Sequence, residues 1–344
     1  MFCDIRKILS EIGVRSLDDI IGRTEFIKQK KDADFNKTKN IDLSRIIADP
    51  DPSNSKPRKR ILERNNRNED PIDFELINYF RKSIDELVPN KLDLNITTVD
   101  RTVGAILSGA IAKKYGNKGL PDDTININFR GIAGQSFGGY LINGINLTLE
   151  GEANDYVGKS MNGGTIAIYP NTRTNFEIEG NSIVGNTVLY GATGGSLFAS
   201  GAAGERFCVR NSGALTVVEG VGDHACEYMT GGEVYILGPV GKNLGAGMSG
   251  GIAYIYNQNK NIVEQINDEM VYIDKISKKD ESKIKNTLEK HFDLTKSKKA
   301  KYILDNFNSE VNSFVRIIPK EIERILSLNG INIDDFDFLN PKLD

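Results

Sequence analysis

A glycine-rich run near residue 245 is the first candidate for nucleotide chemistry. The residues Gly245-Ala246-Gly247-Met248-Ser249-Gly250 read literally as G-x-G-x-x-G. Such a loop binds a dinucleotide when it joins a strand to a helix, because the helix N-terminus holds the pyrophosphate. Here a strand-like run, residues 252–256, follows the loop, and the glycines fall in step with a longer repeat of the chain. We therefore predict that these glycines shape the backbone.

A second candidate is Gly158-Lys159-Ser160, which resembles the end of a phosphate-binding P-loop. That motif needs a glycine at position 153, where this chain has Ala153. It also needs a helix after the serine, whereas residues 165–169 read as a strand. We predict no phosphate site at this run.

Thiol and imidazole chemistry have few candidates among the three cysteines and two histidines. Cys208 and Cys226 occupy the same place in adjacent repeat units, so stacked units would bring them within disulfide reach. We interpret them as free thiols that pack as small apolar side chains in a reducing compartment. No cysteine or histidine lies at a metal-binding spacing except His224 beside Cys226, and we interpret His224 as a turn or surface residue. The chain has only one other histidine, His291, and we therefore predict no histidine-based site.

Acidic side chains on neighbouring strands would indicate carbohydrate chemistry, which uses two carboxylates on either side of a glycosidic bond. Glu150 and Glu219 share a column of the repeat but lie three units apart, and Glu233 belongs to another column. A carbohydrate-active enzyme is therefore the weaker alternative. We assign no catalytic, cofactor-binding or metal-binding residue from the sequence.

Composition excludes several further classes of protein. The formal net charge of −3 gives no overall basic field for nucleic acid or an anionic membrane. The basic run 56–60 could contact nucleic acid, but a solvated segment fits the net negative charge better. No apolar run approaches the ~18 residues of a membrane span, and the first residues lack the apolar core of a signal peptide. We expect a cytoplasmic protein.

The elements that position these residues are dominated by a repeat of about 19 residues. One unit reads as a small residue, eight residues, a glycine, six residues and a second glycine. Clear examples are Gly185-Gly194-Gly201, Gly204-Gly213-Gly220 and Gly222-Gly231-Gly238. The central positions of the seven units are 124, 144, 163, 194, 213, 231 and 250. The long step after position 163 is one period plus an excursion at about residues 171–183.

Inside each unit, apolar residues alternate with mixed ones, as in a half-buried strand. The third residue after the centre is Ile127, Leu147, Ile166, Leu197, Thr216, Val234 or Ala253. The fifth residue is Phe129, Leu149, Ile168, Ala199, Val218, Ile236 or Ile255. Strands that repeat in this way can stack at roughly 4.8 Å, with the glycines accepting positive φ at the corners. The sequence therefore predicts a mainly β fold, a single-stranded parallel, right-handed β-helix of about seven turns with flanking α-helical segments.

The pattern divides the chain into five segments. We predict a helical stump at 1–30, a polar wrapping linker at 31–70, a helical lead-in at 71–120, the β-helix at 121–258 and a helical C-terminal cap at 259–344. Helical periodicity supports the flanking segments, in residues 5–12, 71–87, 284–294, 300–304 and 319–325. The ends of a solenoid expose strand edges, which flanking helices could cover.

Several runs resemble the C-terminal β-helix domain of the glutamate synthase large subunit, the GXGXG domain. The β-helix itself carries the likeness in residues 180–251, which include Gly-Asn-Thr-Val-Leu-Tyr-Gly-Ala-Thr-Gly-Gly and Gly-Gly-Glu-Val-Tyr-Ile-Leu-Gly. The segment 14–24 is similar to the linker that joins the flavin domain to that β-helix, and residues 300–306 and 314–319 to the end of the family's chain. The resemblance implies a structural or assembly domain that packs against the flavin and glutaminase portion, with the small subunit as a further partner.

The same resemblance implies glutamate biosynthesis from glutamine and 2-oxoglutarate, with FMN and an iron–sulfur cluster in the whole enzyme. No position of this chain matches the residues that carry that chemistry. Cys3 follows Met1 and Phe2 and is not an N-terminal nucleophile, and no cysteine trio for a cluster exists. We therefore expect an oxidoreductase part without a cofactor of its own. A free-standing β-helix that binds or assembles with other proteins is the alternative.

Overall fold

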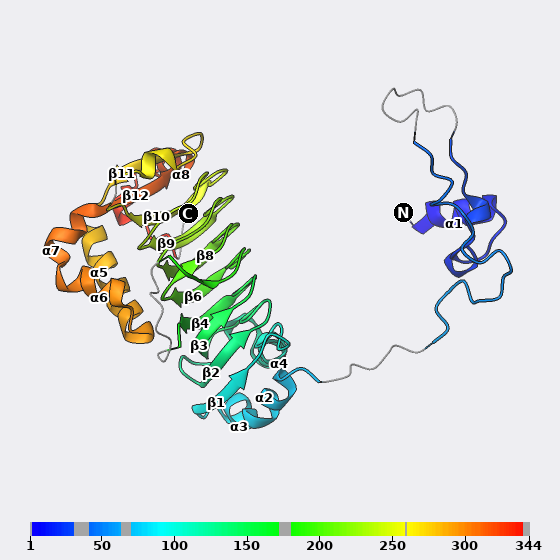
Figure 1. Cartoon of the computed structure of the whole chain (residues 1–344), viewed down its shortest axis with the longest axis horizontal. Coiled ribbons are helices and arrows are strands. Elements are labelled where there is room, and N and C mark those ends of the chain that lie inside the picture. Colours follow the sequence, from blue (N-terminus) through cyan, green and yellow to red (C-terminus); the bar gives the residue numbers. More distant parts are fainter. Residues whose placement is uncertain (1, 31–40, 63–69, 172–179, 259, 340–344) are drawn as a thin grey trace. The chain divides into compact units, whose positions relative to one another are not determined.

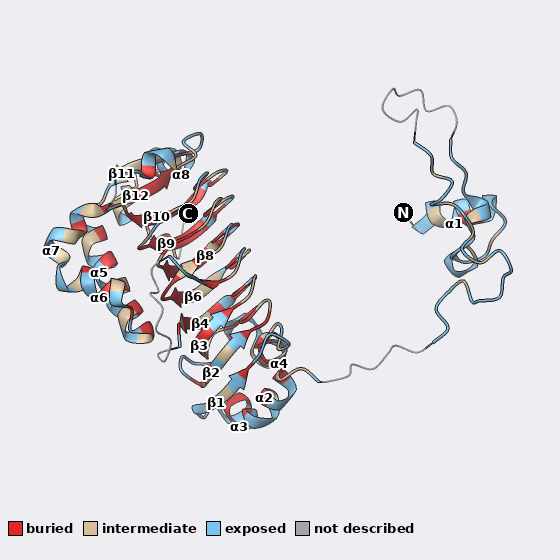
Figure 2. Ribbon diagram, in the orientation of Figure 1, coloured by how far each residue is buried: buried red, intermediate tan, exposed pale blue. Residues whose placement is uncertain are grey.

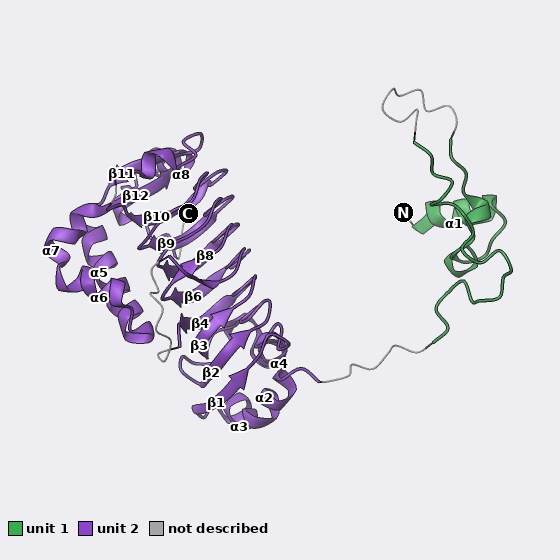
Figure 3. Cartoon of the chain, in the orientation of Figure 1, with its two compact units in different colours: residues 1–69 green, residues 70–344 purple. Residues whose placement is uncertain are grey.

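The computed structural model describes residues 2–30, 41–62, 70–171, 180–258 and 260–339. Two compact units divide the chain, Met1–Glu69 and Asp70–Asp344 (Figure 3). Parts of the predicted linker (31–40 and 63–69) and most of the predicted excursion (172–179) lie outside the described residues. No described helix is long and apolar enough to cross a membrane.

The first unit contains α1 (Phe2–Glu11) and the short 3₁₀ helices η1 (Leu17–Asp19) and η2 (Thr24–Phe26). The helix predicted from the N-terminal periodicity is thus present, and Gly13 follows it with φ +77°. Ser16 caps η1 through a capping box with Asp19. Within the basic run, Arg58 binds Asp49 at 2.7 Å and Lys59 binds Asp18 at 3.2 Å.

The second unit begins with helices and one strand. They are α2 (Asp73–Tyr79), α3 (Arg81–Glu86), β1 (Asn90–Ile96), α4 (Ala105–Tyr115) and the 3₁₀ helix η3 (Gly116–Lys118). The buried Asp73 carboxylate accepts N–H bonds from Gly104, Ile106 and Leu107 at 2.7–3.1 Å, which satisfies donors at the start of α4. The strand β1 was not predicted within this lead-in.

A sheet of 12 strands forms the body of the second unit (Figure 1). Its main path runs β1-β2-β3-β4-β6-β8-β9-β10-β12-β11. The strands after β1 are β2 (Ile125–Ala133), β3 (Ile145–Ala153), β4 (Asn162–Tyr169), β6 (Gly194–Ala199), β8 (Ser212–Val218), β9 (Thr230–Ile236) and β10 (Gly250–Tyr256). All pairs from β1 to β10 on this path are parallel. The short strands β5 (Ser182–Val184) and β7 (Ala202–Ala203) pair with each other beside β3.

Two antiparallel strands make the sheet mixed. The strand β12 (Phe314–Pro319) pairs with β10, and β11 (Val271–Lys275) pairs with β12. The segment 259–344 therefore contains strands as well as the predicted helices. Its helices are η4 (Ile262–Glu264), α5 (Lys278–Thr295), α6 (Lys298–Asp305), α7 (Phe307–Glu310), η5 (Val311–Ser313), α8 (Lys320–Leu328) and η6 (Ile333–Asp335).

The predicted register of the repeat is confirmed along the ladder. The fifth position pairs strand to strand, so that Phe129 lies opposite Leu149 and Leu149 opposite Ile168. The third position behaves in the same way, and its column ends with Val234 opposite Ala253. These two columns lie in the buried inner core. The period of the sequence therefore determines which side chains point inward.

The central glycines act mainly through close approach of the backbone. A Cβ at Gly213 would lie 2.3 Å from the oxygen of Thr193, and one at Gly250 would lie 2.2 Å from that of Thr230. Among the central glycines, Gly144 alone has a positive φ, of +86°. In four units a glycine follows the centre and takes up the left-handed conformation, namely Gly164, Gly195, Gly232 and Gly251. The second glycine of four units, Gly131, Gly151, Gly201 or Gly220, also has a positive φ, between +132° and +157°. The expected positive φ is thus found at the second glycine and just after the centre, and at the centre itself only in Gly144.

The outer face of the sheet is covered over only part of its length (Figure 2). From β6 onward its side chains are buried in a second core with α5, α6 and α8, as for Phe198, Val217, Tyr235 and Tyr254. The equivalent residues of β2 and β3, Asn128 and Thr148, are half-buried. This explains why the position between the third and fifth residues of each unit has a mixed composition, because the helices cover one part of that column and solvent reaches the other.

Candidate functional site

Each turn of the ladder ends in a corner built from left-handed residues. The corner of one turn has Arg206, Cys208 and Arg210 at φ +57°, +60° and +55°, without any glycine. The next turn repeats the pattern at His224, Cys226 and Tyr228. Backbone bonds between turns hold it, such as Arg206 N–H to the oxygen of Asp223 at 2.8 Å. These bonds offset the cost of the left-handed conformation in L-residues.

Both phosphate-like motifs belong to these corners. Gly245 and Gly247 have φ of +74° and +67°, and Gly250 begins β10, so that a strand follows the loop. Lys159 of the second motif places its Nζ 5.3 Å from the ring centre of Tyr156 and 6.0 Å from that of Tyr190. Neither motif opens a helix, and the dinucleotide and P-loop geometries are both excluded.

The two interior cysteines are free and fully buried. They occupy equivalent corner positions in successive turns, as their spacing predicted. Burial raises the pKa of both thiols, to about 12 for Cys226, and the neighbouring Cys226 raises the pKa of Cys208 further. A thiol held protonated is neither a nucleophile nor a metal ligand.

The two histidines lie in different environments. His224 is half-exposed, and its Nδ1 lies 3.0 Å from Nδ2 of Asn243. His291 is wholly buried on α5, with its Nε2 3.4 Å from Oε1 of Glu219. The hydroxyl of Ser297 donates to the same Glu219 oxygen. No local sequence pattern indicates this cluster, since His291 and Ser297 lie 72 and 78 positions from Glu219.

Serine, histidine and glutamate are the residue types of a hydrolase triad, but their arrangement differs from one. In a triad the serine oxygen bonds to the imidazole, which takes up its proton. Here Ser297 bonds to the carboxylate, and its oxygen accepts the N–H of Ala300 at the start of α6. The imidazole is stacked on Phe198 with no exposed surface. The cluster joins α5 and α6 to the end of β8.

The other two glutamates singled out from the sequence, Glu233 and Glu150, each bind different side chains. Glu233 accepts from Tyr235 at 2.8 Å and from Lys283 of α5 at 3.1 Å. Glu150 pairs with Arg130 at 3.2 Å. The three carboxylates therefore do not face one another across a common groove. Among the described residues, no group of three or more His, Cys, Asp or Glu could hold a metal ion.

An ionic cluster with a buried centre surrounds Arg316 of β12, a residue that no sequence motif indicated. Its guanidinium donates to Asp274, Asp280 and Asp334 at 2.5–3.0 Å. Tyr254 of β10 adds a hydroxyl bond to Asp280 at 2.7 Å, and burial raises the pKa of that tyrosine. Asp280 also completes the capping box of α5 with Ser277. The cluster joins β10, β11, β12 and α5.

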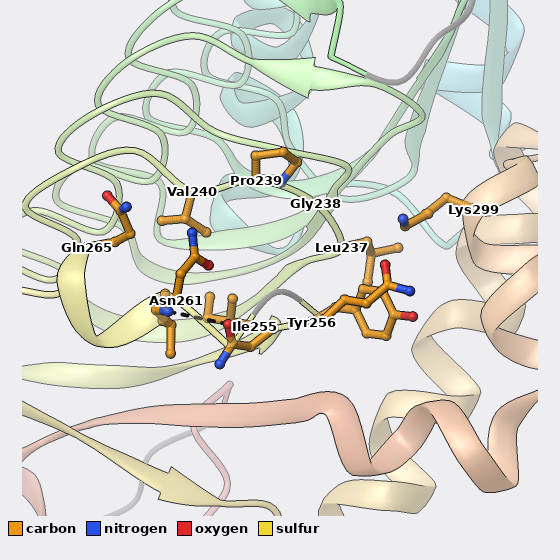
Figure 4. A pocket seen from close by; sticks show the side chains of 12 residues that line it. Leu237, Gly238, Pro239, Val240, Ile255, Tyr256, Asn261, Gln265 and Lys299 are labelled. Atoms are coloured by element: carbon orange, nitrogen blue, oxygen red, sulfur yellow. Dashed lines mark hydrogen bonds between the residues drawn. The ribbon is translucent and has the colours of Figure 1, made fainter.

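A small hollow lies where the ladder meets the C-terminal segment (Figure 4). Its volume is about 120 Å³, well below the ~300 Å³ at which small-molecule sites begin. Lys299 and Tyr256 line one side, and Asn261 and Gln265 line the other. Tyr256 is already bonded to Glu310. Nothing in this hollow brings together a nucleophile and a base.

These features define a class of protein. It is a repeat protein in which a glycine-punctuated parallel ladder carries a helical layer on one face. Residues 73–320 match the family model described as the GXGXG motif, and the chain belongs to that family.

The relatives of this chain are glutamate synthases. The ferredoxin-dependent glutamate synthase 2 of Synechocystis is 44% identical over 95% of this chain and 21% of the relative. The glutamate synthase [NADH] of Schizosaccharomyces pombe is 42% identical over 94% and 15%. The glutamate synthase [NADPH] large chain of Bacillus subtilis is 38% identical over 94% and 21%. The resemblance seen in the sequence is confirmed, and the chain spans about a fifth of the length of most of these relatives.

Proposed function

We propose that this chain is the structural and assembly domain of a glutamate synthase large subunit and is not catalytic by itself. The observation that carries the proposal is that the buried ionisable side chains make structural contacts. Glu219, Glu233 and Asp280 each bind a group of the helical layer or of β12, so that they hold the sheet and helices together. The relatives supply the link to glutamate biosynthesis.

We further propose that the ladder is a single-stranded, right-handed β-helix of about seven turns. In-register parallel pairing and the corner bonds between turns support this shape. In this arrangement 1–30 is the helical stump after a flavin domain, 31–70 the wrapping linker, 71–120 the lead-in and 259–344 the cap. The partner is the flavin and glutaminase portion, with the small subunit as a further partner, in the cytoplasm.

An iron–sulfur cluster does not fit the cysteines of this chain. Such a cluster needs several converging thiolates. Cys208 and Cys226 are buried and protonated, and Cys3 belongs to the other compact unit. We propose that the FMN and the cluster of the whole enzyme are held by the flavin and glutaminase portion.

Isolation of this chain from its source cells tests the proposal. Antibody against the chain should recover a glutaminase–flavin polypeptide, either fused to it or bound to it, in a fixed molar ratio. Sequencing the DNA upstream of Met1 identifies which of the two arrangements applies. Recovery of the chain alone, with no such gene nearby, would favour the free-standing module and overturn the proposal. Cleavage of a polysaccharide would favour the carbohydrate-active alternative.

A further inference from the structure

One side of the corners carries aromatic and cationic side chains over several successive turns. We call this set the corner strip and define it as Tyr140, Tyr156, Lys159, Tyr190, Arg210 and Tyr228. Backbone bonds align its members, because Tyr140 N–H donates to Lys159 at 2.8 Å and Ser160 N–H to Tyr190 at 2.8 Å. Further along, Arg210 N–H donates to Glu227, the residue before Tyr228, at 2.9 Å. The corner strip therefore follows the stacking direction of the ladder.

The tyrosines of the corner strip differ from most others in the chain. Tyr140 and Tyr228 are 55% and 53% exposed. None of the four strip hydroxyls bonds to another described residue, whereas the hydroxyls of Tyr79, Tyr115, Tyr235, Tyr254, Tyr256 and Tyr302 do. The corner strip holds four of the chain's 12 tyrosines, and the chain has no tryptophan. Tyr156 is also exposed, and Tyr190 is half-buried. Tyrosines gathered at a surface in this way are typical of protein interfaces.

The charges of the corner strip are unbalanced. Lys159 and Arg210 have no ion pair among the described residues, and each instead lies over a tyrosine ring. Glu227, the residue before Tyr228, is engaged by Arg206 at 3.0 Å, and Asp155, the residue before Tyr156, accepts the N–H of Asn186 at 2.8 Å. The strip thus presents hydroxyl donors and cations without a free carboxylate. A complementary surface must supply acceptors and negative charge.

The side chains are also held in place before any partner binds. The ring of Tyr228 lies against Gly247 of the next turn, where an added Cβ would come within 2.5 Å of the ring. Arg210 lies over the same ring, with its guanidinium carbon 5.7 Å from the ring centre. Their backbones are fixed by the bonds between turns. For Tyr228 and Arg210, these contacts reduce the side-chain entropy that is lost on binding, which favours affinity.

We propose that the corner strip is the surface on which this chain docks an acidic, acceptor-rich face of the glutaminase–flavin portion. This inference rests on the proposed function and adds the location and chemistry of the interface. Stacking tyrosines can also bind sugar rings, but the paired cations favour a carboxylate-bearing protein surface. A polysaccharide is therefore an outcome of the test.

Photo-crosslinking in the source cells tests the docking surface with the full chain. Tyr140 and Tyr228 are replaced one at a time by p-benzoylphenylalanine. Tyr79 and Tyr302, each 48% exposed on helices, serve as matched controls. After irradiation, peptides of the glutaminase–flavin portion should be linked to positions 140 and 228 at least about tenfold more than to 79 and 302. A charge reversal, Arg210→Glu, should reduce the recovered portion about tenfold, whereas Arg324→Glu should not.

The outcomes separate this inference from the proposed function. If the portion is recovered with the chain but links equally to the controls or not at all to the strip, the docking surface is wrong and the proposed function stands. Links to a second copy of the chain or to a polysaccharide also overturn it. If the unmodified chain recovers no such portion, both proposals fail. Equal thermal midpoints for R210E and R324E show that a loss of binding is not a loss of fold.

Discussion

Arg316 donates through Nη1 to Oδ2 of Asp280 at 2.9 Å, and the side chains of both residues are less than 10% exposed. This contact joins the last part of the sheet to the start of α5. It is also the centre of a network that includes Asp274 and Asp334. The helical layer is thus attached to the ladder by buried ionic bonds as well as by apolar packing.

Removing the cation of this network should destabilise the fold strongly. The substitution Arg316→Leu leaves Asp280 without its cation in the interior, and we expect a loss of about 3 kcal/mol in the free energy of unfolding. Urea denaturation followed by circular dichroism measures it. The control Arg324→Leu breaks a pair exposed at 62% and 48%, and should have no measurable effect. Similar midpoints for the two variants would show that the network contributes little.

The central glycines should be intolerant of even a methyl group. In Gly213→Ala the new Cβ would meet the oxygen of Thr193 at 2.3 Å, so the strands must separate. We expect a loss of about 3 kcal/mol. The matched control is Gly109→Ala on the exposed side of α4, where a Cβ meets nothing within 4 Å. It should stabilise the chain by about 0.5–1 kcal/mol. Thermal unfolding of both variants gives the sign of each change in stability. A G213A variant as stable as the wild type would contradict the close approach of the two backbones.

The buried carboxyl of Asp73 should give a measurable pH dependence. Burial raises its pKa above 3.8 more strongly than the N–H bonds from Gly104, Leu107 and Ile106 lower it. The folded chain therefore holds this proton more tightly than the unfolded chain, and stability declines as pH rises from about 3.8 through the raised pKa. The variant Asp73→Asn lacks this ionisation. Urea midpoints between about pH 3.5 and 7 should show the wild type losing stability relative to D73N. A relative gain with rising pH would contradict this.

Thiol reactivity should separate the three cysteines. Cys3 is exposed, whereas burial raises the pKa of Cys208 and Cys226. We expect one thiol per chain to react with Ellman's reagent at about pH 8 in the folded protein, and three in denaturant. The variant Cys3→Ser should leave none reactive without denaturant. Rapid reaction of three thiols in the native chain would show that the corners open readily.

The ladder was largely predictable because its period appears as a repeating pattern of residue types along the chain. The columns containing Ile127 and Phe129 were assigned from spacing alone, since every turn places equivalent residues opposite one another. The strand β1 also carries a local signal, although it was not predicted. Leu92, Leu94 and Ile96 alternate with polar residues, and their short run lay within a segment interpreted as helical. The glycine columns were found, but the sequence does not reveal which glycine has positive φ and which approaches a neighbouring backbone.

The helical layer and its ionic clusters were much less predictable. Arg316 lies 36 positions from Asp280 and 42 from Asp274, and no motif links them. The Glu219–His291 contact spans 72 positions. Such pairs depend on the tertiary docking of α5, which a local pattern does not encode. The left-handed corners were equally hard to predict, because Arg206 and Arg210 are not residue types that suggest positive φ. Backbone bonds to the neighbouring turns impose it.

We propose that this chain has a structural role and that the cofactors and catalysis belong to the glutaminase–flavin portion. The absorption spectrum of the purified chain between about 350 and 500 nm tests it most directly, since FMN and iron–sulfur clusters absorb in this range. We expect a colourless protein, also after reconstitution with FMN, iron and sulfide under reducing conditions. A stoichiometric flavin or cluster spectrum retained by the chain would contradict it.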